Sequence, residues 1–336
     1  MQAQNKLNFR FTNEFWQQQV PINIATVPQL EQIKNLKDSE LRNLNFAYIK
    51  RNANKYIPRD DQFINVDKVI NGFKKQKKKA KAQRGQLYLP CGYGKTLTSL
   101  WIREKLKAKK TLVLMPSLSL VKQFKDSWKK QETTKTEYLC VCSDKDLDKM
   151  KKAKDENQVA AAELKRNAKV SNNPEEIRKF LRENSNSVVY STYDSFPLIS
   201  EAIKNDDGSF NQSFDLTIFD EAHLTTGKED KIYSLALEDK YLSSEKRLFM
   251  TATPKILSDS YKAKLEKENR ANTVYDMGDE DTYGPVFAET SFAEAIEQGI
   301  ISDYTVLGVY VDRNAEVNDH QALATALNKL QNKYRW

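Results

Sequence analysis

The chain has 336 residues, a formal net charge of +8 and charged side chains at 30% of its positions. A chain of this length can bury a large core and suits two domains, or one domain with extensions. Three cysteines without a C-x-x-C pair argue against a disulfide scaffold and suit a reducing compartment. The sequence shows no signal-peptide pattern and no apolar run of about 18 residues, so we expect a cytoplasmic protein with no membrane partner. The excess of positive charge favours a polyanionic partner.

The N-terminal part of the chain is polar up to residue 57 and rich in Asn and Gln. Apolar residues at helical spacing over 27–49 predict one or two helices, so we expect a small helical extension. Another helix is predicted from about Asp61 to Phe73, and it leads into a basic tract at 74–79. A basic run is usually a solvated face, so this tract is a weak candidate for contact with nucleic acid.

Strands and helices alternate along the chain from residue 86 onward. Strands are predicted at 86–89, 111–115, 138–142, 187–191, 214–219 and 247–250, and helices over 97–106, over 118–130 and in a charged stretch before 187. This alternation predicts an α/β fold, in which helices cover both faces of a mostly parallel sheet. Residues 145–168 are dominated by Lys, Asp, Glu and Ala, so we expect a solvated excursion there.

A glycine-containing loop follows the first of these strands. Residues 89–96 read Leu-Pro-Cys-Gly-Tyr-Gly-Lys-Thr, between a predicted strand and a predicted helix. Glycines and a helix start let backbone N–H groups converge on phosphate oxygens, which the helix dipole also attracts. In such a loop Lys95 reaches the β- and γ-phosphates of ATP, and the Thr96 hydroxyl ligates Mg²⁺. The alternative is an ordinary helix start. The predicted nucleotide-binding residues here are Pro90, Cys91, Gly92, Tyr93, Gly94, Lys95 and Thr96.

Two acidic residues, Asp220 and Glu221, directly follow a short apolar run at 214–219 that lacks a helical period. This arrangement predicts a buried strand with both carboxylates at its C-terminal end, where ligands bind in open α/β sheets. Asp220 is then expected to hold Mg²⁺ through water, and Glu221 to orient or deprotonate the attacking water. The alternative is a charged turn. Together with the loop at 89–96, the acidic pair predicts an NTP-hydrolysing site in which Lys95 and Glu221 are catalytic.

Several further segments resemble the first RecA-like motor domain of superfamily 2 helicases and translocases. The stretch 250–254, Met-Thr-Ala-Thr-Pro, is similar to their motif III, and the stretches 114–120 and 189–193 are similar to motifs Ia and Ib/Ic. Arg59-Asp60-Asp61-Gln62 resembles the adenine-reading R-x-x-Q element, with Asp60-Asp61 in place of the commoner Pro-Tyr. The resemblance covers about 58–311 and implies a RecA-like P-loop NTPase fold that uses ATP and Mg²⁺.

The chain is similar, more narrowly, to the ATPase subunits of type ISP, type I and type III restriction enzymes. The similarity lies in the P-C-G-x-G-K-T loop, in the stretch 141–145, and in Asp-Glu-Ala-His at 220–223 followed by Thr-Thr-Gly at 225–227. The tail segments 283–287, 291–296 and 301–304 fit the same group.

The resemblance also implies roles for single residues. Gln62 is expected to contact adenine, although an ordinary polar residue at a helix N-terminus is the alternative. His223 is expected to couple the nucleotide to nucleic acid, or else to bond only to a neighbouring loop. Thr251 and Thr253 have the same coupling role, or cap the chain around Pro254. The predicted nucleic-acid contacts, through phosphates and sugars, are Pro116, Ser117, Leu118, Thr192, Thr225 and Thr226.

The expected organisation is an N-terminal extension at 1–57, a first RecA-like domain at 58–304 and the start of a second one at 305–336. The resemblance implies a second domain that carries arginine fingers. The tail contains Arg313 and Arg335, both too early to match motif VI, which bears those fingers. We recognise no nuclease metal site before residue 58. We therefore expect this chain to be part of a larger protein, in which the second domain is a partner of the first.

Two function hypotheses follow. The first is the ATP-binding motor domain of a DNA-directed superfamily 2 helicase or translocase from a restriction-modification or other phage-defence enzyme. ATP hydrolysis would be coupled to movement on double-stranded DNA, tracked along one strand. The second is a nucleotide-switched nucleic-acid-binding scaffold without productive turnover. A small-molecule kinase is disfavoured because motifs Ia and III have no purpose there. The sequence distinguishes neither DNA from RNA nor translocation from strand separation.

Overall fold

The computed structural model describes residues 55–76, 82–142, 168–228, 232–258 and 274–303, together with residues 260 and 267. The chain divides into a first unit, 1–301, and a second unit, 302–336. The predicted helices at 27–49, almost all of the charged excursion and the tail at 305–336 lie outside the described residues. Predictions for those segments, and the proposed domain boundaries, stay predictions.

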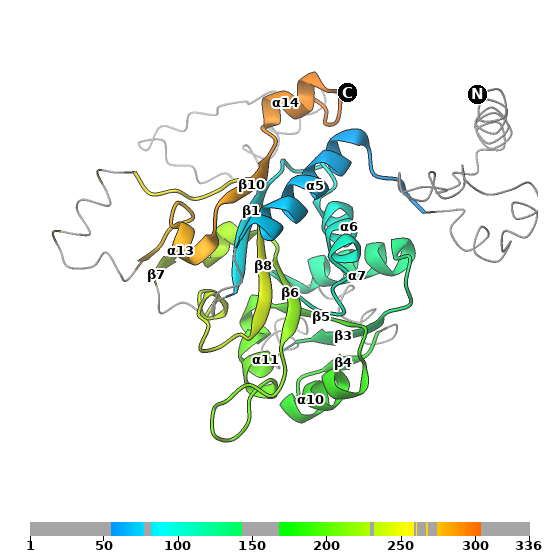
Figure 1. The fold of residues 1–336 in the computed structure, drawn as a ribbon, viewed down its shortest axis with the longest axis vertical. Helices are drawn as coiled ribbons and strands as arrows, with labels where there is room; N and C mark the ends of the chain where they lie inside the picture. Colours follow the sequence, from blue (N-terminus) through cyan, green and yellow to red (C-terminus); the bar gives the residue numbers. More distant parts are fainter. Residues whose placement is uncertain are drawn as a thin grey trace, which may run out of the picture. The chain divides into compact units, whose positions relative to one another are not determined.

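A parallel sheet of eight strands forms the centre of the described part of the first unit (Figure 1). Its strand order is β10-β1-β8-β6-β2-β5-β3-β4, and every neighbouring pair is parallel. The strands are β1 (Gln83–Tyr88), β2 (Lys110–Met115), β3 (Glu137–Val141), β4 (Val170–Ser171), β5 (Ser187–Thr192), β6 (Phe214–Phe219), β8 (Ser244–Thr251) and β10 (Val286–Glu289). Two short strands, β7 (Gly227–Lys228) and β9 (Val274–Tyr275), form a separate antiparallel pair.

Helices cover both faces of the large sheet (Figure 1). One face carries α5 (Asp60–Lys75), α6 (Lys95–Leu106) and α7 (Leu118–Gln131), and the other carries α10 (Pro174–Glu183), α11 (Phe196–Ala202), the 3₁₀ turn η3 (Leu235–Leu237) and α13 (Glu280–Tyr283). Successive strand residues alternate between the two cores, because side chains on a strand point to opposite faces. Val113 packs in the first core, while its neighbours Leu112 and Leu114 pack in the second.

The covered faces explain the sequence pattern of the strands. In β2 every residue from Thr111 to Met115 is buried, so the strand is a continuous apolar run without alternation. The predicted α/β fold with helices on both faces is therefore confirmed, and β6 has the bounds that the sequence predicted. Strands β4 and β10 have only two and four residues, too few to show a period in the sequence.

Strand β10 lies at the edge of the sheet beside β1, where Phe287 packs against two glycines. An added Cβ at Gly85 would lie 1.9 Å from the Phe287 ring, and one at Gly72 would lie 2.2 Å from it. The ring also packs edge-to-face on Phe73 of α5, with ring centroids 4.9 Å apart. One side chain from the C-terminal part of the unit therefore holds α5 and β1 together.

Two arginines meet one carboxylate where β1 and β8 begin. Arg84 and Arg247 are register partners, and each donates to Asp239 Oδ1 at 2.7 Å. Arg247 also donates to the carbonyls of Leu237 and Leu242. Burial and the neighbouring Arg84 charge lower the pKa of Arg247 to about 9. This cluster ties the segment around η3 to the starting edge of the sheet.

Within the described residues, none of the helices combines the length and the hydrophobicity that crossing a membrane requires.

Replacing Gly85 by alanine is expected to lower the free energy of unfolding by about 1–3 kcal/mol, because the new methyl group overlaps the Phe287 ring. Chemical denaturation measures this change. In a Phe287→Ala background the same substitution should cost much less, since the ring it meets is gone. Equal costs in both backgrounds would contradict the packing described here.

Candidate nucleotide-binding site

The loop after β1 has the geometry of a phosphate-binding loop. Gly92 and Gly94 adopt φ angles of 81° and 99°, in the left-handed region that favours glycine. Helix α6 begins at Lys95, immediately after Gly94, so its first N–H groups and the positive end of its dipole face the loop. A Cβ at Gly94 would lie 2.7 Å from the Gln62 amide nitrogen, so a larger residue there would also displace the end of that side chain.

Lys95 and Thr96, the first two residues of α6, lie where the sequence predicted the phosphate and magnesium contacts. The Lys95 ammonium lies over the loop, 3.2 Å from the Leu89 carbonyl and 3.4 Å from the Pro90 carbonyl. The Thr96 carbonyl accepts a hydrogen bond of 2.8 Å from the indole nitrogen of Trp128, which anchors α6 to α7. Cys91 is exposed in the same loop. These contacts hold Lys95 and Thr96 beside the loop.

The start of α5 is hydrogen-bonded to the loop through Tyr93. The Gln62 amide donates to the Tyr93 carbonyl at 3.2 Å, and the Arg59 guanidinium donates to the same carbonyl at 3.0 Å. The Tyr93 side chain is buried, and its hydroxyl accepts from Asn65 at 2.7 Å. The Gln62 carbonyl oxygen accepts from the Arg59 backbone N–H. A primary amide keeps one further N–H and one further lone pair, so the predicted contact of Gln62 with adenine stays a prediction.

The acidic pair lies at the C-terminal end of β6, as predicted. Asp220 is buried, and its Oδ1 atom has no hydrogen-bond partner in the described structure. Burial and the neighbouring Glu221 raise the pKa of Asp220 to about 7, while the Lys95 charge acts in the opposite direction. Lys95 follows β1 and Asp220 follows β6, so both lie at the C-terminal edge of the parallel sheet. Glu221 has a φ of 50°, which is uncommon for a residue with a side chain.

His223 connects the acidic loop to the end of β8. Its Nδ1 atom lies 2.8 Å from the Thr251 hydroxyl oxygen and 3.4 Å from a Glu221 carboxylate oxygen. The Thr251 hydroxyl oxygen in turn accepts from the Thr253 N–H at 3.1 Å. Burial lowers the pKa of His223 despite the Glu221 carboxylate. The three residues predicted to couple the two sites thus form one hydrogen-bonded chain.

Two tyrosines support this loop and were not predicted as functional residues. The Tyr193 hydroxyl donates to the Asp220 carbonyl at 2.8 Å, and the Tyr283 hydroxyl lies 2.9 Å from the Thr225 hydroxyl. Both tyrosines are fully buried. The stretches that contain them, 189–193 and 283–287, carry the family resemblance and were the available signal, but hydrogen bonds to distant segments leave no local pattern in the sequence.

The predicted nucleic-acid contacts have mixed positions. Ser117 is half-buried and caps α7 through the Leu120 N–H. Thr192 is buried, and its hydroxyl bonds to Ser195. Thr225 is fully buried, and its hydroxyl bonds to Ala222 and Tyr283. Both hydroxyls make hydrogen bonds within the fold, and the predicted contacts of Thr192 and Thr225 with nucleic acid stay predictions. Of the remaining predicted contacts, Pro116 is half-buried, and Leu118 and Thr226 are buried. The Thr226 hydroxyl donates to the His223 carbonyl.

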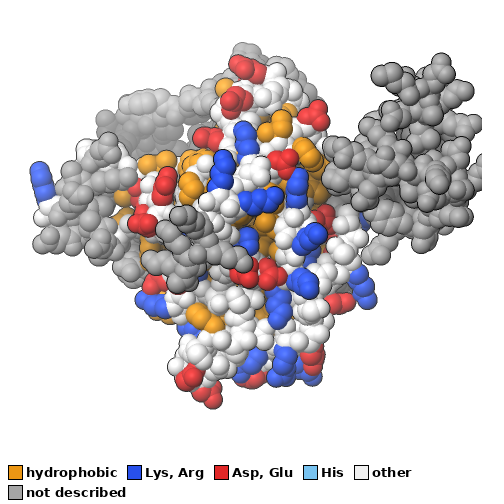
Figure 2. All heavy atoms as spheres, viewed as in Figure 1, with side chains coloured by type: hydrophobic (Ala, Val, Ile, Leu, Met, Phe, Trp, Pro, Cys, Tyr) orange, Lys and Arg blue, Asp and Glu red, His pale blue; other side chains and the backbone are white. Residues whose placement is uncertain are grey.

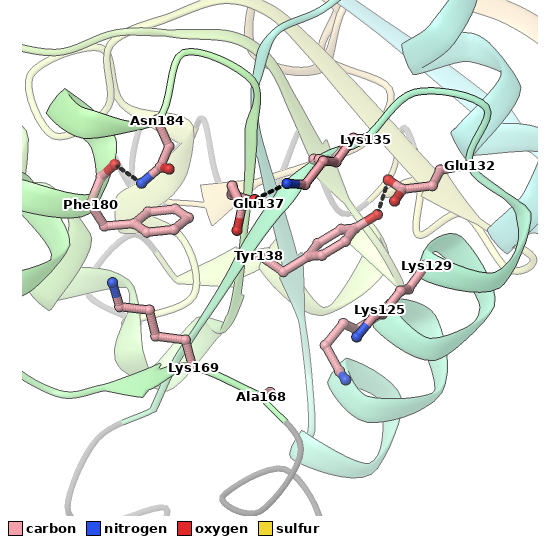
Figure 3. A pocket seen from close by; sticks show the side chains of 11 residues that line it. Lys125, Lys129, Glu132, Lys135, Glu137, Tyr138, Ala168, Lys169, Phe180 and Asn184 are labelled. Atoms are coloured by element: carbon pink, nitrogen blue, oxygen red, sulfur yellow. Dashed lines mark hydrogen bonds and ion pairs between the residues drawn. The ribbon is translucent and has the colours of Figure 1, made fainter.

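A separate cavity of about 430 Å³ lies away from this site, between α7, α10 and the start of β3 (Figure 3). Four lysines and two glutamates are among its lining residues. One glutamate, Glu132, accepts from the Tyr138 hydroxyl, and the other, Glu137, pairs with Lys135 at 3.8 Å.

On the face shown in Figure 2, basic and acidic side chains are interspersed and form no continuous basic stripe. The described fold therefore offers no charge pattern that by itself marks a polyanion track on that face.

The chemistry of the site fits a divalent cation. Asp220 supplies a buried carboxylate oxygen without a hydrogen-bond partner, and oxygen atoms are the ligands that Mg²⁺ prefers. The other predicted ligand, Thr96, is half-buried at the mouth of the loop. A cation there would offset the cost of burying the Asp220 charge.

Asp220→Asn is expected to stabilise the metal-free protein at pH 8 by about 1–3 kcal/mol. The folded protein holds the Asp220 proton more tightly than the unfolded chain, whose pKa is near 3.8. The wild type therefore loses stability as the pH rises from about 4 to about 7, and the full penalty is present above pH 7. Chemical denaturation in EDTA at pH 5.5 and pH 8 measures the effect, which should be larger at pH 8.

The exposed Asp206 provides a matched control, since Asp206→Asn removes a carboxylate that is not buried. Mg²⁺ with ADP should stabilise the wild type and leave Asp220→Asn nearly unchanged. An advantage of the asparagine variant that is equal at both pH values would show that the buried charge is not its cause.

Comparisons with known proteins agree with this geometry. The family described as "Type III restriction enzyme, res subunit" matches residues 55–256, more than half of the chain. The probable helicase A859L of African swine fever virus (isolate Tick/Malawi/Lil 20-1/1983) is 28% identical over 222 residues. That match covers 66% of this chain and 21% of the viral protein.

Two solved structures are also similar. The ATP-dependent Type ISP restriction-modification enzyme LlaBIII bound to DNA has a TM-score of 0.56 and 28% identity, over 74% of this chain and 16% of that one. A nuclease-deletion mutant of the Type ISP enzyme LlaGI, in complex with a DNA substrate mimic, has a TM-score of 0.53 and 27% identity, over 73% and 21%. This chain thus spans about a fifth of the length of these relatives. The RecA-like class predicted from the sequence is confirmed. The chain belongs to the family of the type III restriction enzyme res subunit, and its described core is a superfamily 2 helicase-like motor domain near the ATPases of restriction enzymes.

Proposed function

We propose that this chain binds ATP with Mg²⁺ and is the first motor domain of a DNA-directed translocase or helicase from a restriction-modification or related defence enzyme. The observation that carries the nucleotide part is a loop with two left-handed glycines before α6, at the same edge of the parallel sheet as the buried Asp220 carboxylate, whose Oδ1 atom has no hydrogen-bond partner. DNA as the partner is supported by the two Type ISP enzymes, each of which was solved with DNA or a DNA mimic.

The residues of the site would divide the work as follows. Backbone N–H groups of the loop and the Lys95 ammonium bind the phosphates, while Asp220 and Thr96 hold Mg²⁺. When bound, Mg²⁺ offsets negative charge that develops on the phosphoryl oxygens. Glu221 orients the attacking water and accepts its proton. His223 lies between the Glu221 carboxylate and Thr251, so a change at the water position is passed to the end of β8.

We expect this chain alone to hydrolyse ATP very slowly. In motors of this class an arginine finger from a second domain stabilises the transition state and contributes about 10³–10⁵ in rate. A steady-state phosphate-release assay, with a longer version of the protein that contains the second domain as reference, measures the difference. Vigorous turnover by this chain, abolished by Lys95→Ala, would contradict the need for a second domain.

Glu221→Gln separates a motor from the second candidate, a nucleotide-switched scaffold without productive turnover. In a motor it should slow single-turnover hydrolysis by about 10²–10⁴-fold, because the water loses its base, while ATP binding is retained. Calorimetry and quenched-flow measurements with protein in excess give the two quantities. The matched control is Glu245→Gln, which changes an exposed glutamate at the start of β8. Equal behaviour of the wild type and Glu221→Gln would favour the scaffold.

A further inference from the structure

The loop that carries the acidic pair is held at its first residue by Tyr193. The Tyr193 hydroxyl donates to the Asp220 carbonyl at 2.8 Å, and on the other side the Asp220 N–H donates to the Leu114 carbonyl of β2 at 2.9 Å. The backbone of Asp220 is therefore fixed on both sides by groups outside its own strand.

The bonded carbonyl belongs to the peptide that joins Asp220 to Glu221. Glu221 has a φ of 50°, a left-handed conformation that residues with a side chain rarely adopt. The hydrogen bond from Tyr193 helps to hold the peptide in this uncommon orientation. That orientation sets the direction of both carboxylates.

The Tyr193 hydroxyl is a dependable donor. The side chain is fully buried, and its ring stacks on Tyr233 with centroids 5.0 Å apart. The bond from the Tyr193 hydroxyl to the Asp220 carbonyl is therefore held in place by the packing of the ring.

Tyr193 directly follows β5, at the same edge of the sheet as the nucleotide site. In the sheet β5 and β6 are not neighbours, because β2 lies between them, so Tyr193 reaches past the end of β2 to Asp220. Tyr193 is the first residue of the 3₁₀ turn η1 (Tyr193–Ser195), which Thr192 caps and in which Asp194 is half-buried. This turn is part of the loop that the sequence assigned to nucleic-acid contact. One residue thus joins that loop to the magnesium ligand.

We propose that Tyr193 is a positioning residue that couples the loop after β5 to the acidic pair, so that DNA binding at this loop and Mg²⁺-nucleotide binding affect one another. The inference rests on the proposed function. A shift of the turn moves the Tyr193 hydroxyl, and the Asp220 carbonyl then loses its partner or follows it. Because coupling between two binding sites is reciprocal, it can be measured in this chain without any turnover.

The experiment measures the dissociation constant for a fluorescent DNA duplex with a single-stranded tail, with and without Mg²⁺ and a non-hydrolysable ATP analogue. The ratio of the two constants is the coupling factor, which for coupled sites is typically about 5–150. Tyr193→Phe keeps the ring and its stacking on Tyr233 but removes the hydroxyl. We expect its coupling factor to fall towards 1, while the affinity for DNA without nucleotide stays within about threefold of the wild type.

Two further variants separate coupling from general loosening. Tyr233→Phe removes the hydroxyl of the stacked partner, which donates to Asp194. Tyr283→Phe removes the support at the far end of the loop, on Thr225. Both should keep most of the coupling factor. Chemical denaturation of all three variants shows how much stability each hydroxyl contributes.

The outcome of each measurement either supports or overturns the proposal. A Tyr193→Phe variant with the wild-type coupling factor would overturn it, and so would a Tyr233→Phe variant that loses as much coupling. A wild type that binds the nucleotide but shows no change in DNA affinity would also overturn it, and would leave the nucleotide site standing. A wild type that binds no nucleotide at all would instead refute the proposed function.

Discussion

Parallel strand pairing is the constraint on which the site depends. Every strand of the large sheet runs in the same direction, so the residue that follows each strand arrives at one common edge. The loop after β1, the turn after β5, the acidic pair after β6 and Thr251 at the end of β8 all lie there. Residues more than a hundred positions apart thereby become neighbours without any long-range signal in the sequence. The opposite edge is left for structural contacts, such as the two arginines that share Asp239.

Helix α5 and the loop after β1 are joined by hydrogen bonds and form one structural unit. Arg59 and Gln62 bond to the same carbonyl of Tyr93, and the Tyr93 side chain is buried beneath the loop. The other end of α5 is held by Phe287, which packs between Gly72 and Gly85. The helix that the resemblance assigns to adenine recognition is thus clamped between the loop and the edge strand β10. A displacement of β10 would therefore also displace α5 and the loop that α5 contacts.

Sequence reasoning predicted the parts of this protein whose patterns lie within a few consecutive residues. The loop with Lys95 and Thr96 and the strand before Asp220 each have a pattern within a few residues, and the structure has them where they were expected. It failed where contacts join distant segments. Tyr193 and Tyr283 were missed because their role consists of single long-range hydrogen bonds, which leave no periodic trace.

Besides anchoring α6 to α7, the Trp128 indole is a chromophore that lies next to the start of α6. Its nitrogen donates to the Thr96 carbonyl, one peptide away from the Lys95 carbonyl, and its ring is shielded from solvent within the first core. A chromophore so placed responds to small changes in the polarity and strength of that single hydrogen bond. Trp128 therefore contributes an intrinsic fluorescence signal that depends on the start of α6, alongside the emission of the other three tryptophans of the chain.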